Sequence, residues 1–366
     1  MKTTPNLLAA AGIPEQEIAK RIADTENAIF LDPAERFYFE TGGDAGYMMD
    51  TGNFDARTEG MSYGMMMAVQ RGRKDIFDRL WTFSLRYMHN ANGPYAGYFA
   101  WSVQPDGARN SDGPAPDGEE YYAMALFFAA ARWGSAEPPF DYAAQARAIL
   151  RHAVHQPQLI KGGHAMWDEE TALIRFVPEL PFSDPSYHLP HFYERFALLA
   201  DPADRPFWQR AAQASRSYLA LACHPQTGLA PEYAHYNGKP ETEHGHGDFF
   251  SDAYRVAMNI GLDSAWCGQR PEYRTIADNL QRFLWGREPF QTYTVAGEPK
   301  NPPALHPTAV IATTAAASLA TDTPLSRAWV QKFWNTPPRT GDRRYYDNCL
   351  YFFCLLMLSG EYRCYA

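Results

Sequence analysis

The sequence predicts an all-α fold in which six helical hairpins close into a ring. Three observations support this prediction. About twelve segments have helical periodicity with no series of strand-like segments among them, helix-start signals recur at a regular spacing, and every second helical segment is the more apolar one. The chain has 366 residues, of which 46% are hydrophobic, so it is long enough for such a ring. We expect a single domain over residues 1–366.

The predicted helices have apolar residues three and four positions apart and polar loops between them. In chain order they span 14–31, 58–70, 74–90, 118–133, 140–154, 186–199, 204–222, 251–266, 271–285, 307–320, 325–335 and 342–359. The longest loops cover 91–117, 156–185, 224–250 and 286–306 and are rich in Gly, Pro, Asn and Asp. Loops of this length usually carry function or small strands of their own.

Residues typical of helix N-termini recur along the chain. They occur at Thr58-Glu59, Asp117, Ser186-Tyr187, Ser251-Asp252, His306-Pro307 and Asp342-Arg343. The steps between them are 59, 69, 65, 55 and 36 residues, against 61 for six equal units. The helices that start there are the apolar ones, so we expect them to form an inner ring. Their N-termini would share one rim, and the long loops would wall a cleft at that end.

Composition narrows the class of protein. The formal net charge is −9 and basic residues do not cluster, which argues against a nucleic-acid or anionic-membrane partner. The longest apolar runs are too short to span a bilayer. Five cysteines form no CxxC pair, so we expect neither a structural metal nor a cofactor. Pro14, Glu15 and Glu17 interrupt the first apolar patch, which predicts a cytoplasmic protein. The oligomeric state is left open.

Three carboxylates open apolar helical segments: Glu59, Asp117 and Asp252. Taken singly, each has a structural explanation, because an acid at a helix start accepts backbone N–H groups and meets the positive end of the helix dipole. On inner helices of one ring, however, all three would face a common axis. A cluster of carboxylates in a cleft is costly, and it is typical of a catalytic site.

Aromatic residues near the same rim indicate the substrate class. Trp101 and Tyr187 stand out, and Trp167, Trp266, Tyr345 and Tyr346 are further candidates, although most of the 53 aromatic residues must belong to the core. Flat apolar rings combined with polar side chains such as Arg255 suit the binding of sugars. Paired acids with stacking rings are the equipment of glycoside hydrolysis.

Five motifs, TEGMSYGMM, YFAWSV, PDGEEYYAMAL, DPSYH and FFSDAYRVAMNIGLD, carry a resemblance that extends over nearly the whole chain. In this order they are similar to the successive motifs of glycoside hydrolase family 8, and RRYYDNCLYFF is similar to the branch that releases xylose from the reducing end. The resemblance implies an (α/α)6 barrel and an inverting mechanism. It also implies that Glu59 is the general acid, Asp252 the general base, Asp117 the residue that holds the central sugar, and Tyr187 a partner of the attacking water.

The acid and the base need different pKa values. For Glu59 we expect burial near Met61, Met65 and Met66, together with the charge of Asp117, to favour the protonated acid. For Asp252 we expect Arg255, three residues later on the same face, to favour the carboxylate. Ser251 precedes the base where many family members have an aromatic residue, so nearby Asp248 is kept as an alternative base.

The stretch GEPKNPPALHPTAV, 297–310, bears on where the substrate is cut. Its prolines restrict the backbone, and we expect Leu305 and His306 to lie at the rim. They could form only a rigid entry to the helix, or they could form a wall that closes the cleft one sugar beyond the point of cleavage. The resemblance implies the wall, with His306 bonded to the terminal sugar and Tyr346 nearby. We therefore expect release of xylose from short xylo-oligosaccharides. An endo-acting xylanase, glucanase or chitosanase remains the alternative, since residue types do not distinguish xylose from glucose.

Rival readings come from other classes. His244 and His246 have a spacing that could hold a metal, but no third ligand follows at fixed spacing. His188 and His191 could shuttle protons in a sugar epimerase on a helical barrel, which would leave Glu59 and Asp252 unexplained. A non-catalytic carbohydrate binder would use the aromatic residues and not the acids.

Overall fold

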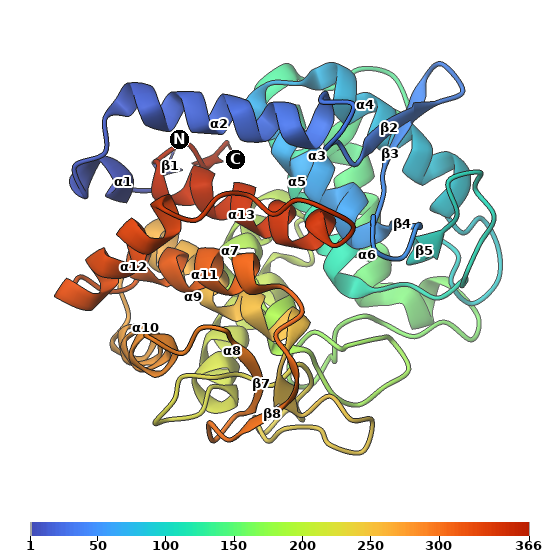
Figure 1. The fold of residues 1–366 in the computed structure, drawn as a ribbon. Coiled ribbons are helices and arrows are strands. Elements are labelled where there is room, and N and C mark those ends of the chain that lie inside the picture. Colours follow the sequence, from blue (N-terminus) through green and yellow to red (C-terminus); the bar gives the residue numbers. More distant parts are fainter. Residues whose placement is uncertain (1, 366) are drawn as a thin grey trace.

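The computed structural model describes residues 2–365, and it has the predicted (α/α)6 architecture (Figure 1). Six inner helices form a closed ring in which each contacts the next. They are α3 (Thr58–Arg71), α5 (Pro116–Trp133), α7 (Pro190–Leu199), α9 (Arg255–Cys267), α11 (Pro307–Ala316) and α13 (Arg344–Leu358). The outer helices are α2 (Glu15–Phe30), α4 (Lys74–Phe83), α6 (Tyr142–Leu159), α8 (Arg205–Ala222), α10 (Pro271–Leu284) and α12 (Pro324–Trp334).

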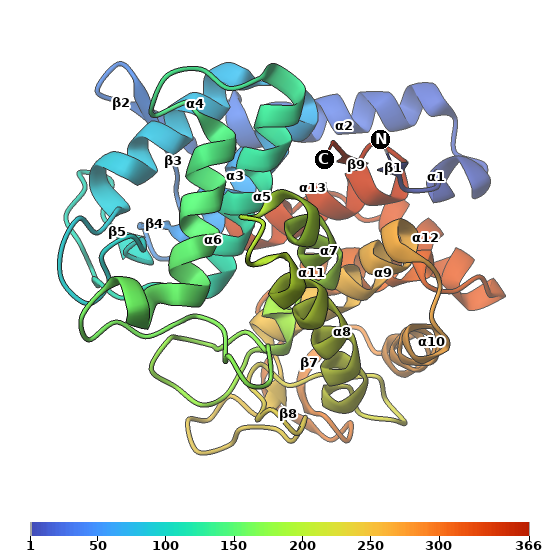
Figure 2. The same ribbon diagram turned by 180° about the vertical axis from the view of Figure 1, so that it is seen from behind.

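The two ends of the chain close the ring. Helix α2 packs on α13, so the last inner helix takes its outer partner from the N-terminal segment (Figure 1). Beside this pair, strand β1 (Lys2–Thr3) is antiparallel to β9 (Arg363–Cys364). A short helix, α1 (Leu7–Ala10), connects β1 to α2. Seen from behind, the outer helices α6 and α8 lie in front of the inner ring (Figure 2).

The remaining strands lie in the loops at the N-terminal ends of the inner helices or beside them. They form two antiparallel pairs and one three-stranded sheet: β2 (Tyr38–Thr41) with β3 (Ala45–Met48), β4 (Ala56–Arg57) with β5 (Ser102–Val103), and β6 (Asp248–Phe249) with β7 (Gln291–Thr294) and β8 (Pro299–Pro303). Strand β4 leads directly into α3, so its pairing with β5 fixes the start of that helix against the loop that carries Trp101.

Several helix starts differ from the sequence prediction. The predicted helix 186–199 is a 3-10 turn, η2 (Pro185–Tyr187), followed by α7, and the predicted helix 251–266 is a 3-10 turn, η3 (Ser251–Tyr254), followed by α9. Pro190 explains the first break, because a proline disfavours helical conformation in the preceding residue. Two further short turns, η1 (Ser84–Met88, a π-helix) and η4 (Ala317–Leu319), extend α4 and α11.

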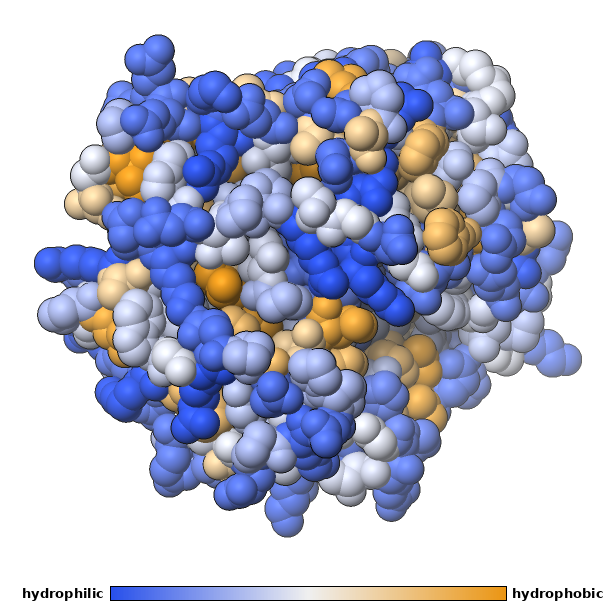
Figure 3. Space-filling view, viewed as in Figure 1, coloured by the Kyte–Doolittle hydropathy of each residue, from blue (hydrophilic) through white to orange (hydrophobic). Residues whose placement is uncertain are grey.

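The inner helices are buried on nearly every side, as their apolar sequences predict. In α13, each residue from Tyr345 to Leu358 is buried, and in α5 the same is true from Pro116 to Ala129. The face of the molecule in Figure 3 is mostly hydrophilic, with hydrophobic residues scattered over it. Among residues 2–365, no helix is both long and apolar enough to cross a bilayer.

Candidate active site

The three predicted acids meet at the N-terminal ends of the inner helices. Glu59 lies in the first turn of α3, Asp117 in the first turn of α5, and Asp252 in η3 just before α9. All three contact one guanidinium group, that of Arg255 at the start of α9. Nη1 of Arg255 lies 2.8 Å from Asp117 Oδ2 and 3.3 Å from Glu59 Oε2, and its Nη2 lies 3.4 Å from Asp252 Oδ1. The structure therefore brings the three carboxylates together at one side chain.

Arg255 has a wider role than the sequence suggested. We expected it to pair with Asp252, but its shortest ion pair is with Asp117, and Nη1 also donates to the hydroxyl of Tyr63 at 3.0 Å. The guanidinium is buried, and it stacks over the Tyr187 ring at 5.4 Å. It therefore holds the carboxylates together from below the surface of the site.

Glu59 lies in a setting that favours its protonated form. Its side chain is 16% exposed, and Tyr345 donates its hydroxyl to Oε1 at 3.0 Å. Burial raises the pKa of Glu59 to about 8, the charges of Asp117 and Asp252 act in the same direction, and Arg255 opposes them. The direction agrees with the expectation from the sequence, although the hydrogen-bond partners of the carboxylate are Tyr345 and Arg255.

Each of the first two acids is followed by a glycine, and the packing explains why. A Cβ atom on Gly60 would lie 2.3 Å from the Tyr345 hydroxyl, the same group that bonds Glu59. A Cβ atom on Gly118 would lie 2.4 Å from Cβ of Thr58. The side chains of Tyr345 and Thr58 therefore pack directly on the backbone beside the two acids, where only glycine leaves room for them.

Asp184 is a fourth carboxylate that the sequence analysis did not single out. Its side chain is buried, its Oδ1 accepts the backbone N–H of Ser186 at 2.7 Å, and its Oδ2 lies 3.8 Å from Nη2 of Arg255. Burial raises the pKa of Asp184 well above its ordinary value, and the charge of Asp252 adds to the effect. The available signal was the DPSYH motif, in which Asp184 caps the turn that presents Tyr187.

Two cavities of unequal volume meet at Glu59 and Asp252. The larger has a volume of about 430 Å³ and the smaller about 120 Å³, and Arg57, Glu59 and Asp252 line both. The acid and the base candidates therefore stand at the junction of a roomy compartment and a confined one.

The larger cavity holds the predicted aromatic residues Trp101 and Tyr187, together with Asp117. Trp101 is 36% exposed, and the guanidinium of Arg57 lies 5.3 Å from the centre of its ring. Tyr187 is buried below Arg255. The other large side chains of this wall are Phe176 and Tyr233, which come from the long loops 156–185 and 224–250 and carry no helix-start signal in the sequence.

The smaller cavity is lined by Leu305 and His306, as well as by Tyr345 and Tyr346. His306 lies against the Tyr346 ring at 4.6 Å between ring centres, and its Nδ1 is 3.0 Å from Asp347 Oδ2. The contact with Asp347 fixes the imidazole and leaves Nε2 as its second polar atom. Both tyrosines line this cavity, which answers a question that the sequence left open.

The rival residues lie elsewhere or have other partners. Asp248, the alternative base, lines neither cavity and pairs with Lys300 at 2.6 Å. His188 is buried between the hydroxyls of Ser183 and Ser215, each 2.8 Å away, and burial lowers its pKa to about 3. Burial likewise lowers the pKa of His191 to about 3.

His244 and His246, which were considered as metal ligands, each pair with a glutamate. His244 lies 3.0 Å from Glu241, and His246 lies 2.9 Å from Glu232. Among the residues that the structure describes, no group of three or more His, Cys, Asp or Glu side chains could hold a metal ion.

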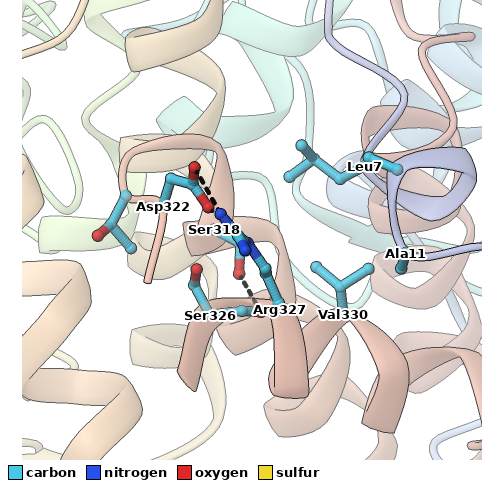
Figure 4. Close-up of a pocket in the computed structure, with 9 residues that line it drawn as sticks. Leu7, Ala11, Ser318, Asp322, Ser326, Arg327 and Val330 are labelled. Atoms are coloured by element: carbon cyan, nitrogen blue, oxygen red, sulfur yellow. Dashed lines mark hydrogen bonds and ion pairs between the residues drawn. The ribbon is translucent and has the colours of Figure 1, made fainter. Parts of the chain in front are cut away.

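A separate hollow of about 340 Å³ lies at the opposite end of the inner helices, between α1 and α12 (Figure 4). Its polar groups bond one another: Arg327 pairs with Asp322 at 2.9 Å, and the Ser318 hydroxyl donates to the carbonyl of Ser326 at 3.0 Å. With its polar groups satisfied, this hollow is a weaker candidate than the carboxylate-lined pair.

Comparison with known proteins agrees with this geometry. The family model "Glycosyl hydrolases family 8" matches residues 36–360. The reducing end xylose-releasing exo-oligoxylanase of Halalkalibacterium halodurans is 55% identical over 363 residues, which cover 98% of this chain and 93% of that protein. Two solved structures of reducing-end-xylose releasing exo-oligoxylanase, one complexed with xylose and one of a variant complexed with xylobiose, superpose with TM-scores of 0.98. Each is 54% identical and covers 100% of this chain and 98% of its own. The chain therefore belongs to glycosyl hydrolase family 8.

Proposed function

We propose that this glycoside hydrolase releases single xylose units from the reducing end of short β-1,4-xylo-oligosaccharides with inversion of configuration. The observation that carries the proposal is the pair of unequal cavities that meet at Glu59 and Asp252. The confined cavity accepts the leaving sugar, and Leu305 and His306 block a longer product. The larger cavity accepts the rest of the chain, with Trp101 as a stacking surface.

In this proposal Glu59 acts as the general acid and protonates the glycosidic oxygen. Asp252 acts as the general base, and its position is suited to that role because its side chain is 29% exposed and open to water. Tyr187 positions the attacking water, and Asp117 holds the sugar at the centre. Arg255 lines neither cavity, so it acts on the substrate through these carboxylates.

His306 and Tyr346 bind the sugar that leaves. Asp347 fixes the imidazole through Nδ1, so Nε2 can hydrogen-bond a hydroxyl of the reducing-end xylose. The relatives named as exo-oligoxylanases and the solved complexes with xylose and xylobiose support this choice of sugar.

Xylotriose labelled at its reducing end tests the position of the cut. Labelled xylose should be the first product, as detected by mass spectrometry at the start of the reaction. Shortening the loop around Leu305 and His306 should admit longer products. Early labelled xylobiose, or a rapid fall in the viscosity of xylan, would instead indicate an endo-acting xylanase. A parallel panel of gluco- and chito-oligosaccharides separates the other endo-acting alternatives.

Inversion is tested by proton NMR during the first minutes of the reaction. A β-linked xylotriose should give xylobiose that is initially the α-anomer. A crystal structure should show the carboxyl groups of Glu59 and Asp252 about 6.5–9.5 Å apart, since a separation of ~5–5.5 Å is typical of a retaining pair.

The remaining expectations concern the chain as a whole. We propose a single catalytic domain over residues 1–366, which should unfold in one calorimetric transition. We also propose a cytoplasmic location, where only imported oligosaccharides reach the enzyme, and fractionation of cells that produce it tests this.

A further inference from the structure

The backbone that carries Asp252 is strained. Ser251 has φ = +33°, and among the described residues only Phe54 and Ala172 are other non-glycine residues with positive φ. Such a conformation is costly for a residue with a side chain, and it persists where surrounding contacts over-determine it. The contacts that hold this segment should therefore matter for the position of the Asp252 carboxylate.

Two side chains contact the peptide group between Ser251 and Asp252, one at its C=O and the other at its N–H. The hydroxyl of Tyr346 donates to the carbonyl oxygen of Ser251 at 3.3 Å. The carboxyl group of Glu232 faces the backbone N–H of Asp252, which acts to lower the pKa of Glu232 against the effect of burial. Because a peptide group is planar, fixing both its C=O and its N–H fixes the orientation of the Cα atom from which the Asp252 side chain projects.

Glu232 is itself fixed. Its side chain is only 9% exposed, and Oε2 lies 2.9 Å from Nδ1 of His246. The backbone of the same segment is paired as well, since Glu232 donates to the carbonyl of Asp248, and Tyr233 donates to that of His246, both at 2.9 Å. The Tyr233 ring stacks on the His246 imidazole at 4.4 Å and lines the larger cavity.

The charges around Glu232 favour its neutral form. Burial raises the pKa of Glu232 to about 9, the nearby carboxylates of Asp252 and Asp184 act in the same direction, and Arg255 opposes them. The other groups that face it are His246 and the hydroxyl of Tyr254. A neutral carboxyl group donates to His246 with one oxygen and accepts from Asp252 N–H without repelling the Asp252 carboxylate.

From this geometry we infer that Glu232, held by His246, positions the general base. It acts by accepting a hydrogen bond from the backbone N–H of Asp252. The inference rests on the proposed function, in which Asp252 is the base. It also gives the EHGHGD segment a role that needs no metal ion.

Four variants test the inference, with xylotriose as substrate and kcat, KM and thermal unfolding as readouts. Glu232→Ala removes the acceptor, so kcat should fall on the order of 10²-fold, the cost of a displacement of about 1 Å, with little change in KM. Glu232→Gln keeps a neutral acceptor for Asp252 and a donor for His246, so it should restore most of kcat. His246→Ala should give an intermediate loss.

His244→Ala is the matched control. His244 bonds Glu241 with nearly the same geometry, 3.0 Å from Nδ1 to Oε2, and is 55% exposed, but Glu241 does not contact Asp252. The kcat of His244→Ala should equal that of the unaltered enzyme. A crystal structure of Glu232→Ala should show a rotated Ser251–Asp252 peptide.

Three outcomes would overturn the inference: Glu232→Ala with unaltered kcat, Glu232→Gln as impaired as Glu232→Ala, or His244→Ala as impaired as His246→Ala. If Glu232→Ala does not fold, unaltered kcat in His246→Ala overturns it. Failure of the proposed function is a different result, because the unaltered enzyme would then release no xylose from xylotriose.

Discussion

Replacing Glu59 with Gln tests the general acid most directly. Burial raises the pKa of Glu59 to about 8, which favours the protonated form at pH 7, so Gln matches its size and its charge and keeps the hydrogen bond from Tyr345. KM for xylotriose should therefore change little. What is lost is the transferable proton, which contributes roughly 10²–10⁴-fold to the rate. We expect kcat to fall by that factor.

Xylobiosyl fluoride provides the decisive comparison, because fluoride leaves without a proton. The Glu59→Gln enzyme should lose much less activity on this substrate than on xylotriose. Equal losses on both substrates would refute the acid role.

The pH profile offers a second readout. kcat/KM of the unaltered enzyme should decline above about pH 8, as Glu59 ionises, and the residual activity of Glu59→Gln should lack this decline. Glu119→Gln is the matched control. Glu119 is also a buried glutamate with a raised pKa, but it bonds the backbone of Phe99 and lines neither cavity. It should retain the activity and the pH profile of the unaltered enzyme.

Four further predictions follow from the same contacts. Gly60→Ala must displace the Tyr345 ring, so urea unfolding should show a loss of about 1–3 kcal/mol, and kcat should fall as Glu59 loses its partner; unaltered kcat would contradict the tight packing. Asp184→Asn should be far more active than Asp184→Ala, because burial raises the pKa of Asp184 and favours its neutral form, which Asn resembles, and because Asn keeps an oxygen that can cap the turn. The folded-state pKa of Glu59 is raised from 4.5 to about 8, so the folded form binds more protons across that window and its stability falls as the pH rises through it; calorimetry should find Glu59→Gln stabilised at pH 7 and not at pH 4. His306→Ala should weaken inhibition by xylose. An unchanged inhibition constant would show that His306 does not bind the leaving xylose in the smaller cavity.

The ring of hairpins was predictable because its signals are local. Periodicity and helix-start residues mark each helix, and the apolar sequences of α5 and α13 distinguish inner from outer helices. The pairing of α2 with α13 was not predictable in this way, because it joins segments more than three hundred residues apart. The 3-10 turns before α7 and α9 were also missed, since periodicity does not register a break of a few residues.

The same distinction separates the site residues. Glu59, Asp117 and Asp252 were found because each opens an apolar segment. Asp184 and Glu232 were missed because they lie in loops, and they join the site only through tertiary contacts with Arg255 and with the backbone of Asp252. Arg255 was assigned one partner from helical spacing, whereas three further carboxylates reach it from other elements.

The charge balance around Arg255 links the fold to the division of labour. Four carboxylates surround one guanidinium group, so full ionisation would leave a strongly negative cluster in a poorly solvated site. Burial raises the pKa of Glu59, Asp117 and Asp184, whose side chains are 16%, 7% and 0% exposed. Asp252, at 29%, is the most exposed of the four. Burial thus favours the protonated form in the three less exposed carboxyl groups, while the carboxyl group that we assign to water activation is the one that water can reach.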